Sequence, residues 1–197
     1  MDNYERIKIT SLNEENLKIV EKNLIISERN TIEFKNLHPN LHRVVPRRGD
    51  FKETLNKMKL GEETCLIALL DSRPVGCLHL RWWGDHDIER IVAEKPAASK
   101  YLTVPAIYNF WVKLSYRSKG VGQRLIAEAE SLALRRNYNQ LGVLVDLVNP
   151  RAHKLYDRLG YLDVGLGVIE TSGKYIQNGK SIEWKNGPEI YLCKKLK

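Results

Sequence analysis

The sequence predicts an α/β fold built around one mixed β-sheet. A short alternating strand precedes two amphipathic helical segments, and later strands alternate with two more helical segments. A chain of 197 residues is long enough for one domain with a full hydrophobic core. Because no repeat, low-complexity segment or linker divides the sequence, we expect a single domain over residues 1–197.

Two helix-start patterns lie in the N-terminal half. Ser11 with Glu14, and more loosely Asp50 with Glu53, have the spacing of a capping box. Gly61 is typical of a helix end, because glycine readily adopts the left-handed conformation found there. The elements expected in this half are a strand over 6–10, a helix carrying Leu17, Val20 and Leu24, an irregular segment over about 29–49, and a helix from Asp50 through Leu60.

Apolar runs and turn residues define the rest of the chain. The expected central elements are strands over 64–70 and 75–83, a long polar loop over 84–103, a strand over 105–114, the main helix over 121–136, a buried strand over 141–148 and a short helix over 150–159. The expected tail has strands over 164–169, 174–177, 181–184 and 189–196, with turns at Asn178-Gly179 and Asn186-Gly187-Pro188.

A glycine-containing loop opens the main helix. Gly120 and Gly122 allow the backbone to approach a ligand closely, because neither carries a Cβ. A helix start also presents unpaired N–H groups and the positive end of the helix dipole, both of which suit phosphate. Arg117, Lys119 and Arg124 add positive charge at the same place. The loop therefore indicates a pyrophosphate-binding site between a strand and a helix.

The spacing of this loop differs from two better-known phosphate motifs. It has no Gly-Lys-Ser/Thr ending, as a Walker loop requires, and it lacks the third glycine of Gly-x-Gly-x-x-Gly. The remaining pattern is Arg-x-x-Gly-x-Gly from Arg117 to Gly122. Considered alone, this pattern also fits a tight turn before a basic helix.

A second motif follows about thirty residues later, over Asn149–Tyr161. It matches Asn-x-x-Ala-x-x-Leu-Tyr-x-x-x-Gly-Tyr position by position. Together, the two motifs resemble those of the GNAT superfamily of acetyl-CoA-dependent N-acetyltransferases, in the same order and at the usual separation. The part of the chain that carries the resemblance runs from about Ala106 to Tyr161.

The resemblance implies a GNAT-like fold, with a mixed, mostly antiparallel sheet flanked by helices. It also implies acetyl-CoA as cosubstrate and direct transfer of the acetyl group to a primary amine within a ternary complex. We expect a small-molecule acceptor in preference to a protein N-terminus or lysine. An alternative function is that of a non-catalytic regulatory module that binds acyl-CoA.

The resemblance also implies which residues bind the coenzyme. The loop supplies backbone N–H groups to the pyrophosphate, and the preceding strand supplies main-chain groups to the pantetheine arm. Asn149 also fits a purely structural role, as the N-cap of a helix with proline at its first position. For Gln123 and Arg124, solvated helix surface is an equal alternative. The expected coenzyme-binding residues are Val112, Lys113, Leu114, Arg117, Ser118, Lys119, Gly120, Val121, Gly122, Gln123, Asn149, Ala152 and Tyr156.

Tyr156 is the candidate general acid. A phenol with a pKa of about 10 stays protonated at neutral pH and can give its proton to a leaving thiolate. The apolar spacing of Ala152, Leu155, Tyr156 and Leu159 alone favours a core position for this tyrosine. The family resemblance favours the catalytic role instead.

The sequence identifies no general base. The strand over 105–114 has no acidic residue and offers only Tyr108 and Asn109 at its centre. Asp146, within the strand over 141–148, fits a hydrogen-bonded strand residue. Further candidates for binding or deprotonating an amine lie in the loop over 84–103, where a solvated acidic loop is the alternative: Asp85, His86, Asp87 and Glu89.

Composition narrows the classes of partner. The formal net charge of +8 suits a polyanionic ligand such as coenzyme A. Basic pairs such as Arg47-Arg48 and Arg135-Arg136 lack the interleaved aromatic residues of a base-stacking surface, so we expect no nucleic-acid partner. No apolar run is long enough to span a bilayer.

The three cysteines, Cys65, Cys77 and Cys193, indicate buried reduced thiols in a cytoplasmic protein. They have no metal-type spacing, and no His/Cys cluster suggests a metal site. We expect a monomer or a homodimer.

Overall fold

A computed structural model describes residues 6–24, 50–177 and 180–197. The elements in chain order are β1 (Ile7–Ser11), α1 (Glu14–Leu24), α3 (Asp50–Lys59), β2 (Glu63–Leu70), β3 (Arg73–Arg81), α4 (His86–Ile91), the 3₁₀ helix η1 (Pro96–Tyr101), β4 (Ala106–Val112), the 3₁₀ helix η2 (Leu114–Tyr116), α5 (Val121–Arg135), β5 (Gln140–Asp146), α6 (Pro150–Arg158), β6 (Leu162–Asp163), β7 (Ile169–Gln177) and β8 (Lys180–Lys195).

The strands form one sheet in the order β1-β2-β3-β4-β5-β8-β6, and β7 pairs with β8 beside this path. Six of the strand pairs are antiparallel, and β4 with β5 is the parallel pair among the described residues. The mixed, mostly antiparallel sheet that the resemblance implied is therefore confirmed.

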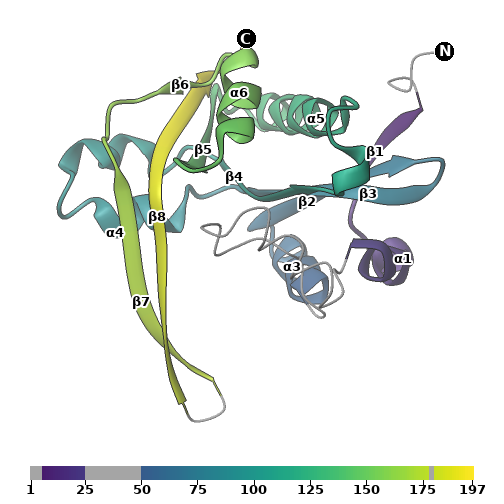
Figure 1. The fold of residues 1–197 in the computed structure, drawn as a ribbon, viewed down its shortest axis with the longest axis horizontal. Coiled ribbons are helices and arrows are strands. Elements are labelled where there is room, and N and C mark those ends of the chain that lie inside the picture. The colour runs from purple at the N-terminus through teal and green to yellow at the C-terminus, as the bar shows by residue number, and fades with distance from the viewer. Residues whose placement is uncertain (1–5, 25–49, 178–179) are drawn as a thin grey trace.

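Helices cover both faces of the sheet (Figure 1). α5 and α6 lie on one face, and α1 and α3 lie on the other. The core of the α5 face includes Val121, Leu125 and Ala129, which recur at helical spacing. On the opposite face, Val20 of α1 and Phe51 of α3 pack over β2 and β3. The sheet is thus the middle layer, and helices pack against its central strands on both faces.

The parallel pair β4–β5 is short. It holds only at Ala106 opposite Gly142 and Ile107 opposite Val143, although each strand has seven residues. Beyond Ile107, β4 remains paired only with β3, while β5 is paired along its length with β8. The later parts of β4 and β5 therefore diverge, which opens the sheet at its centre.

A bulge in β4 lies at this opening. Register shifts between His79 opposite Tyr108 and Cys77 opposite Trp111, so that two residues of β4 face one residue of β3. Asn109, one of those two, has φ of +45°, in the left-handed region. The bulge changes the direction of the backbone where β4 has no partner strand on its other side.

Helix α1 begins two residues later than the predicted capping box implies. The reciprocal pair is Asn13 and Asn16: each side-chain Oδ1 accepts a hydrogen bond from the other residue's backbone N–H, at 2.8 and 2.9 Å. Ser11 instead belongs to β1. The expected pairing of Ser11 with Glu14 was wrong because asparagine at N-cap and N3 supplies the same two acceptors in the register that the strand end permits.

The predicted long loop over 84–103 contains two helical segments, α4 and η1. Asp85 caps α4 by accepting a hydrogen bond from the Asp87 N–H at 2.8 Å. The apolar side chains of the segment, Ile88, Ile91, Ala98 and Tyr101, are buried in one cluster with Tyr191 of β8. The sequence predicted a polar loop here because each helix is short and only one of its faces is apolar and buried.

The tail is simpler than predicted. One strand, β8, replaces the two expected over 181–184 and 189–196. The turn expected at Asn186-Gly187-Pro188 is instead an irregularity within β8, where Gly187 has φ of +93° and the register with β7 shifts. Pairing with β7 on one side and β5 on the other keeps the strand continuous there. In Figure 1 the far end of the β7–β8 pair extends beyond the helices, while the upper part of β7 lies beside α4.

Two expectations lie outside the described residues, namely the irregular segment over 29–49 and the turn at Asn178-Gly179. Within the described ranges, no helix has the length and apolar character needed to cross a membrane.

Candidate functional site

The middle of β4 is more exposed than its ends. Ala106, Ile107, Trp111 and Val112 are buried, whereas Asn109 is exposed. A central strand is normally covered along its length, so this exposure coincides with the opening between β4 and β5. The backbone of the bulge is therefore available to a ligand that enters the gap.

The loop between η2 and α5 has the backbone shape of an anion-binding turn. Ser118 and Gly120 have φ of +58° and +80°, and Gly120 is the N-cap of α5. Arg124 N–H donates to the Gly120 carbonyl at 3.0 Å, which closes the first turn and leaves the N–H groups of Val121 and Gly122 without partners within the helix. The loop thus presents the positive helix end that the sequence predicts.

The second motif contributes a cation to the same loop. The guanidinium of Arg151, in the first turn of α6, donates to Ser118 Oγ at 3.0 Å. Arg117 Nε donates to the Val112 carbonyl at 2.9 Å, which fixes the loop against the end of β4. Burial and the nearby charge of Arg151 lower the pKa of Arg117.

These features fit a pyrophosphate group. Two guanidinium groups held close together repel each other, and an anion between them relieves that repulsion. Space at the helix start is also limited, because a Cβ added at Gly122 would lie 3.0 Å from Phe110 Cζ. Glycine at position 122 therefore allows the start of α5 to pack closely against Phe110 and Leu155.

The structure places the other predicted coenzyme residues around this loop. Val112 is buried at the end of β4, and Leu114 is 44% exposed just after it. Lys119 Nζ lies 5.6 Å from the ring centroid of Tyr116, and Gln123 is exposed on the first turn of α5. For the Lys113 side chain between them, partial burial lowers the pKa.

Arg124 faces away from the loop. Its guanidinium donates to the Ile7 carbonyl of β1 at 2.8 Å. This cation therefore ties α5 to the edge of the sheet, a contact that the local sequence does not reveal.

Tyr156 of α6 is buried beside the opening. Its ring makes edge contacts with Phe110 of β4 and with Tyr161, at centroid distances of 6.5 and 5.2 Å. Burial raises the pKa of Tyr156 well above its ordinary value, so the phenol is protonated throughout the physiological range. The tyrosine belongs to the core, as its helical spacing predicts, and also contacts the divergent part of β4.

Asn149 caps α6. Its Oδ1 accepts a hydrogen bond from the Ala152 N–H at 3.2 Å, and Pro150 follows at the first helical position. The structural role expected for Asn149 is therefore present. This cap also sets the start of the helix that carries Arg151 and Tyr156.

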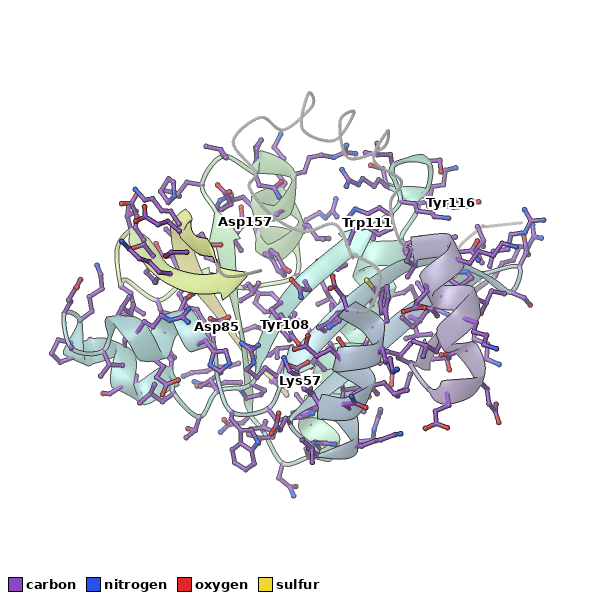
Figure 2. The ribbon with its side chains drawn as sticks, turned by 90° about the horizontal axis from the view of Figure 1, so that it is seen from below. Lys57, Asp85, Tyr108, Trp111, Tyr116 and Asp157 are labelled. Atoms are coloured by element: carbon purple, nitrogen blue, oxygen red, sulfur yellow. The ribbon has the colours of Figure 1, made fainter. Side chains whose placement is uncertain are left out.

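A pocket of about 580 Å³ lies on the α3 face of the sheet. Its charged lining centres on Glu63 of β2, whose Oε1 is 3.4 Å from Arg81 and 3.7 Å from Lys57. The Arg81 guanidinium lies 4.4 Å from the ring centroid of Tyr108. Figure 2 shows Lys57, Asp85 and Tyr108 grouped at the centre of the molecule.

Sequence reasoning missed Glu63, Arg81 and Lys57. Glu63 begins an apolar strand, and its partner Arg81 is identified only by the register of β2 with β3. An acidic residue next to a buried strand is the one local signal, and it also fits an exposed strand end. Tertiary pairing was needed to show that the carboxylate is inside.

The acidic residues expected in the loop have separate positions. Asp85 and Glu89 line the pocket, while Asp87 forms an ion pair with Arg90 at 2.8 Å. Burial is the main cause that raises the pKa of Asp85. Asp146 Oδ1 accepts from the Val148 N–H at 2.9 Å, so it stabilises the turn after β5.

The opening in the sheet and the basic loop over 117–122 together fit an extended phosphorylated ligand. A family model described as the Acetyltransferase (GNAT) family matches residues 32–161, well over half of the chain. The chain therefore belongs to the GNAT acetyltransferase family, which confirms the resemblance drawn from the two motifs. The cosubstrate of this family is acetyl-CoA.

Solved structures share the fold. A PaiA N-acetyltransferase from Thermoplasma acidophilum in complex with coenzyme A is 16% identical, with a TM-score of 0.57 over 96% of this chain and 98% of that chain. YncA of Salmonella typhimurium, a putative acetyltransferase with acetyl-CoA, is 13% identical, with a TM-score of 0.59 over 98% and 95%. An N-acetyltransferase from Staphylococcus aureus is 13% identical, with a TM-score of 0.61 over 97% and 99%. No curated protein matches the chain.

Proposed function

We propose that the protein transfers the acetyl group of acetyl-CoA directly to a primary amine of a small molecule. The observation that supports this best is that Arg117, next to Arg151, and Tyr156 both contact the part of β4 that is not paired with β5, at Val112 and Phe110. The start of α5 would hold the pyrophosphate of the coenzyme, and the main chain of β4 would face its thioester.

Each group in the opening has a role in this reaction. Acetyl-CoA supplies the thioester when bound. The loop over Arg117–Gly122 holds the pyrophosphate, and the bulge at Asn109 exposes β4 main-chain groups that orient the acyl end. Tyr156 then gives its phenolic proton to the thiolate that leaves when the amine attacks the acetyl carbon. The amide C–N bond forms as the thioester C–S bond breaks, and the proton that the amine nitrogen loses passes to solvent water, from which Tyr156 regains its own.

The pocket beside Tyr108 supports a small-molecule acceptor. Its volume of about 580 Å³ falls within the usual range for small-molecule sites. Three cysteines that are buried and unbonded also support a reducing compartment such as the cytoplasm.

The test is a coupled pair of measurements on the intact protein. Release of free thiol from acetyl-CoA is followed across small amines and short peptides, and thermal stabilisation by acetyl-CoA is measured alongside. Turnover with small amines supports the proposal. Turnover with peptides alone would show that the protein is a protein acetyltransferase instead. Stabilisation without turnover by any acceptor favours a regulatory binding module, and absence of stabilisation contradicts the phosphate-loop assignment.

A further inference from the structure

We propose that the pocket on the α3 face binds a positively charged group of the acceptor. The acceptor would therefore carry a second ammonium or guanidinium group in addition to the amine that is acetylated. This inference rests on the proposed function and specifies its substrate class. We call the pocket, lined by Lys57, Glu62, Glu63, Arg81, Trp83, Asp85, His86, Glu89 and Leu102, the cation pocket.

One carboxylate oxygen of Glu63, Oε2, lacks a hydrogen-bond partner among the described residues, while the Tyr108 side chain also interacts with this carboxylate. Its side chain is only 3% exposed, and both nearby cations, Lys57 and Arg81, lie closest to Oε1. Oε2 is buried and has no hydrogen-bond partner among residues 6–24, 50–177 and 180–197. A buried carboxylate oxygen normally has a donor, because leaving it without one costs free energy. A donor from a ligand would satisfy it.

The charge of the pocket favours a cationic ligand. Four carboxylates, Lys57, Arg81 and His86 line it, and His86 Nδ1 lies 3.6 Å from Glu89 Oε2. Lys57 and Arg81 are already engaged: Lys57 also pairs with Glu53 at 3.1 Å, and Arg81 lies on the Tyr108 ring. The remaining carboxylates leave the pocket acidic in a chain whose formal net charge is +8. A ligand with a second positive charge is electrostatically complementary to this acidic pocket.

The cation pocket adjoins the opening in the sheet. Tyr108 is the first residue of β4 beyond the last pair with β5, and Arg81 contacts its ring. Burial and the neighbouring Glu63 carboxylate raise the pKa of Tyr108. Arg81, which lines the pocket, therefore connects it to Tyr108 at the edge of the opening. A linear acceptor can hold its cationic end at Glu63 while its other amine reaches the opening.

A comparison of diamines with monoamines tests the proposal on the unmodified protein. Linear diamines from diaminopropane to diaminohexane are each paired with the monoamine of the same chain length. We expect the best diamine to exceed its monoamine by about 10- to 100-fold in kcat/KM, the range typical of one hydrogen bond to a charged group. Equal kcat/KM values across the series would overturn the proposal and leave the proposed acetyl transfer intact.

Variants locate the effect. Glu63→Gln is expected to weaken binding of the best diamine by about 10- to 100-fold, measured by calorimetry with coenzyme A present. Glu94→Gln, which changes an exposed carboxylate outside the cation pocket, is the matched control and should bind the diamine normally. Undiminished diamine binding by a folded Glu63→Gln protein would overturn the proposal.

A second variant covers the case in which Glu63→Gln does not fold. Asp85→Asn keeps a side-chain acceptor for the start of α4 while removing a pocket charge. We expect it to weaken diamine binding several-fold and to leave coenzyme A affinity unchanged. Diamine binding equal to that of the unmodified protein would count against the cation pocket. If the unmodified protein did not bind coenzyme A at all, that result would instead contradict the proposed function.

Discussion

At the scale of single residues, Tyr156 is both a core residue and the candidate acid. Replacing it with phenylalanine removes one oxygen from a buried ring and leaves the contacts with Phe110 and Tyr161 in place. We predict that kcat falls by about 100-fold, because general acids typically contribute 100-fold or more. Free-thiol release measures kcat, and calorimetry should show unchanged affinity for coenzyme A.

The matched control for this prediction is Tyr101→Phe. Tyr101 is also a buried tyrosine, but it packs with Tyr191 in the separate cluster around α4. The control should retain full kcat. If Tyr156→Phe retained it as well, the leaving thiolate would need no proton from this phenol, and Tyr156 would be a packing residue only.

His79 gives the protein a predictable sensitivity to acid. Burial, aided by Lys57 and Arg81, lowers the pKa of this histidine from 6.5 to about 4. Between these pH values the unfolded chain binds a proton that the folded protein excludes, so the free energy of unfolding decreases as pH falls from about 6.5 towards 4. The contribution at stake is about 3 kcal/mol, and urea denaturation at neutral pH and at a pH of about 5 would measure it.

Two variants separate His79 from the other titrating groups. His79→Leu removes the buried imidazole and should make the dependence on pH shallower across this interval. His86→Gln changes a histidine whose side chain is 62% exposed and should leave the slope unchanged. Identical slopes for all three proteins would show that His79 is not the group responsible.

At the scale of elements, the phosphate loop depends on two helices that are distant in sequence. Arg151 of α6 reaches Ser118 in the loop before α5. We predict that Arg151→Ala weakens coenzyme A binding by about 10-fold, because one charged contact to a phosphate is lost. The same variant should show a shallower decrease of affinity with added salt.

Arg158→Ala is the control for this prediction. Arg158 is an exposed arginine at the last turn of the same helix and carries the same charge. Its removal tests whether net positive charge alone attracts the coenzyme. An equal loss of coenzyme A affinity in the two variants would show that overall positive charge, and not the local contact of Arg151, accounts for the effect.

The elements themselves differ in how well local sequence predicted them. The starts of α5 and α6 were predicted because glycine, asparagine and proline act within one turn of the helices they begin. α4 was missed because its stability comes from Ile88 and Ile91 packing against distant residues such as Tyr191. β8 was expected as two strands, since only pairing with β5 and β7 keeps it continuous through Gly187.

At the scale of the whole molecule, the expectation of a single domain leads to a thermodynamic prediction. One sheet crosses the described residues, and helices from both halves of the chain pack on it. We predict one cooperative unfolding transition in denaturant. Coenzyme A at about 100 times its dissociation constant should raise the free energy of unfolding by about 2.7 kcal/mol. Two separate transitions, with only one responding to coenzyme A, would indicate two domains.

By itself, the sequence determined the family, the loop over Arg117–Gly122 and the roles open to Asn149 and Tyr156, because these depend on residues close together in the chain. Tertiary structure decided where the sheet opens, how Arg151 joins the loop and which carboxylate is buried in a pocket. Glu63 shows the reason most clearly. Its environment is created by Arg81 and Lys57, which reach it through strand register and helix packing, and neither is a property of the neighbouring sequence.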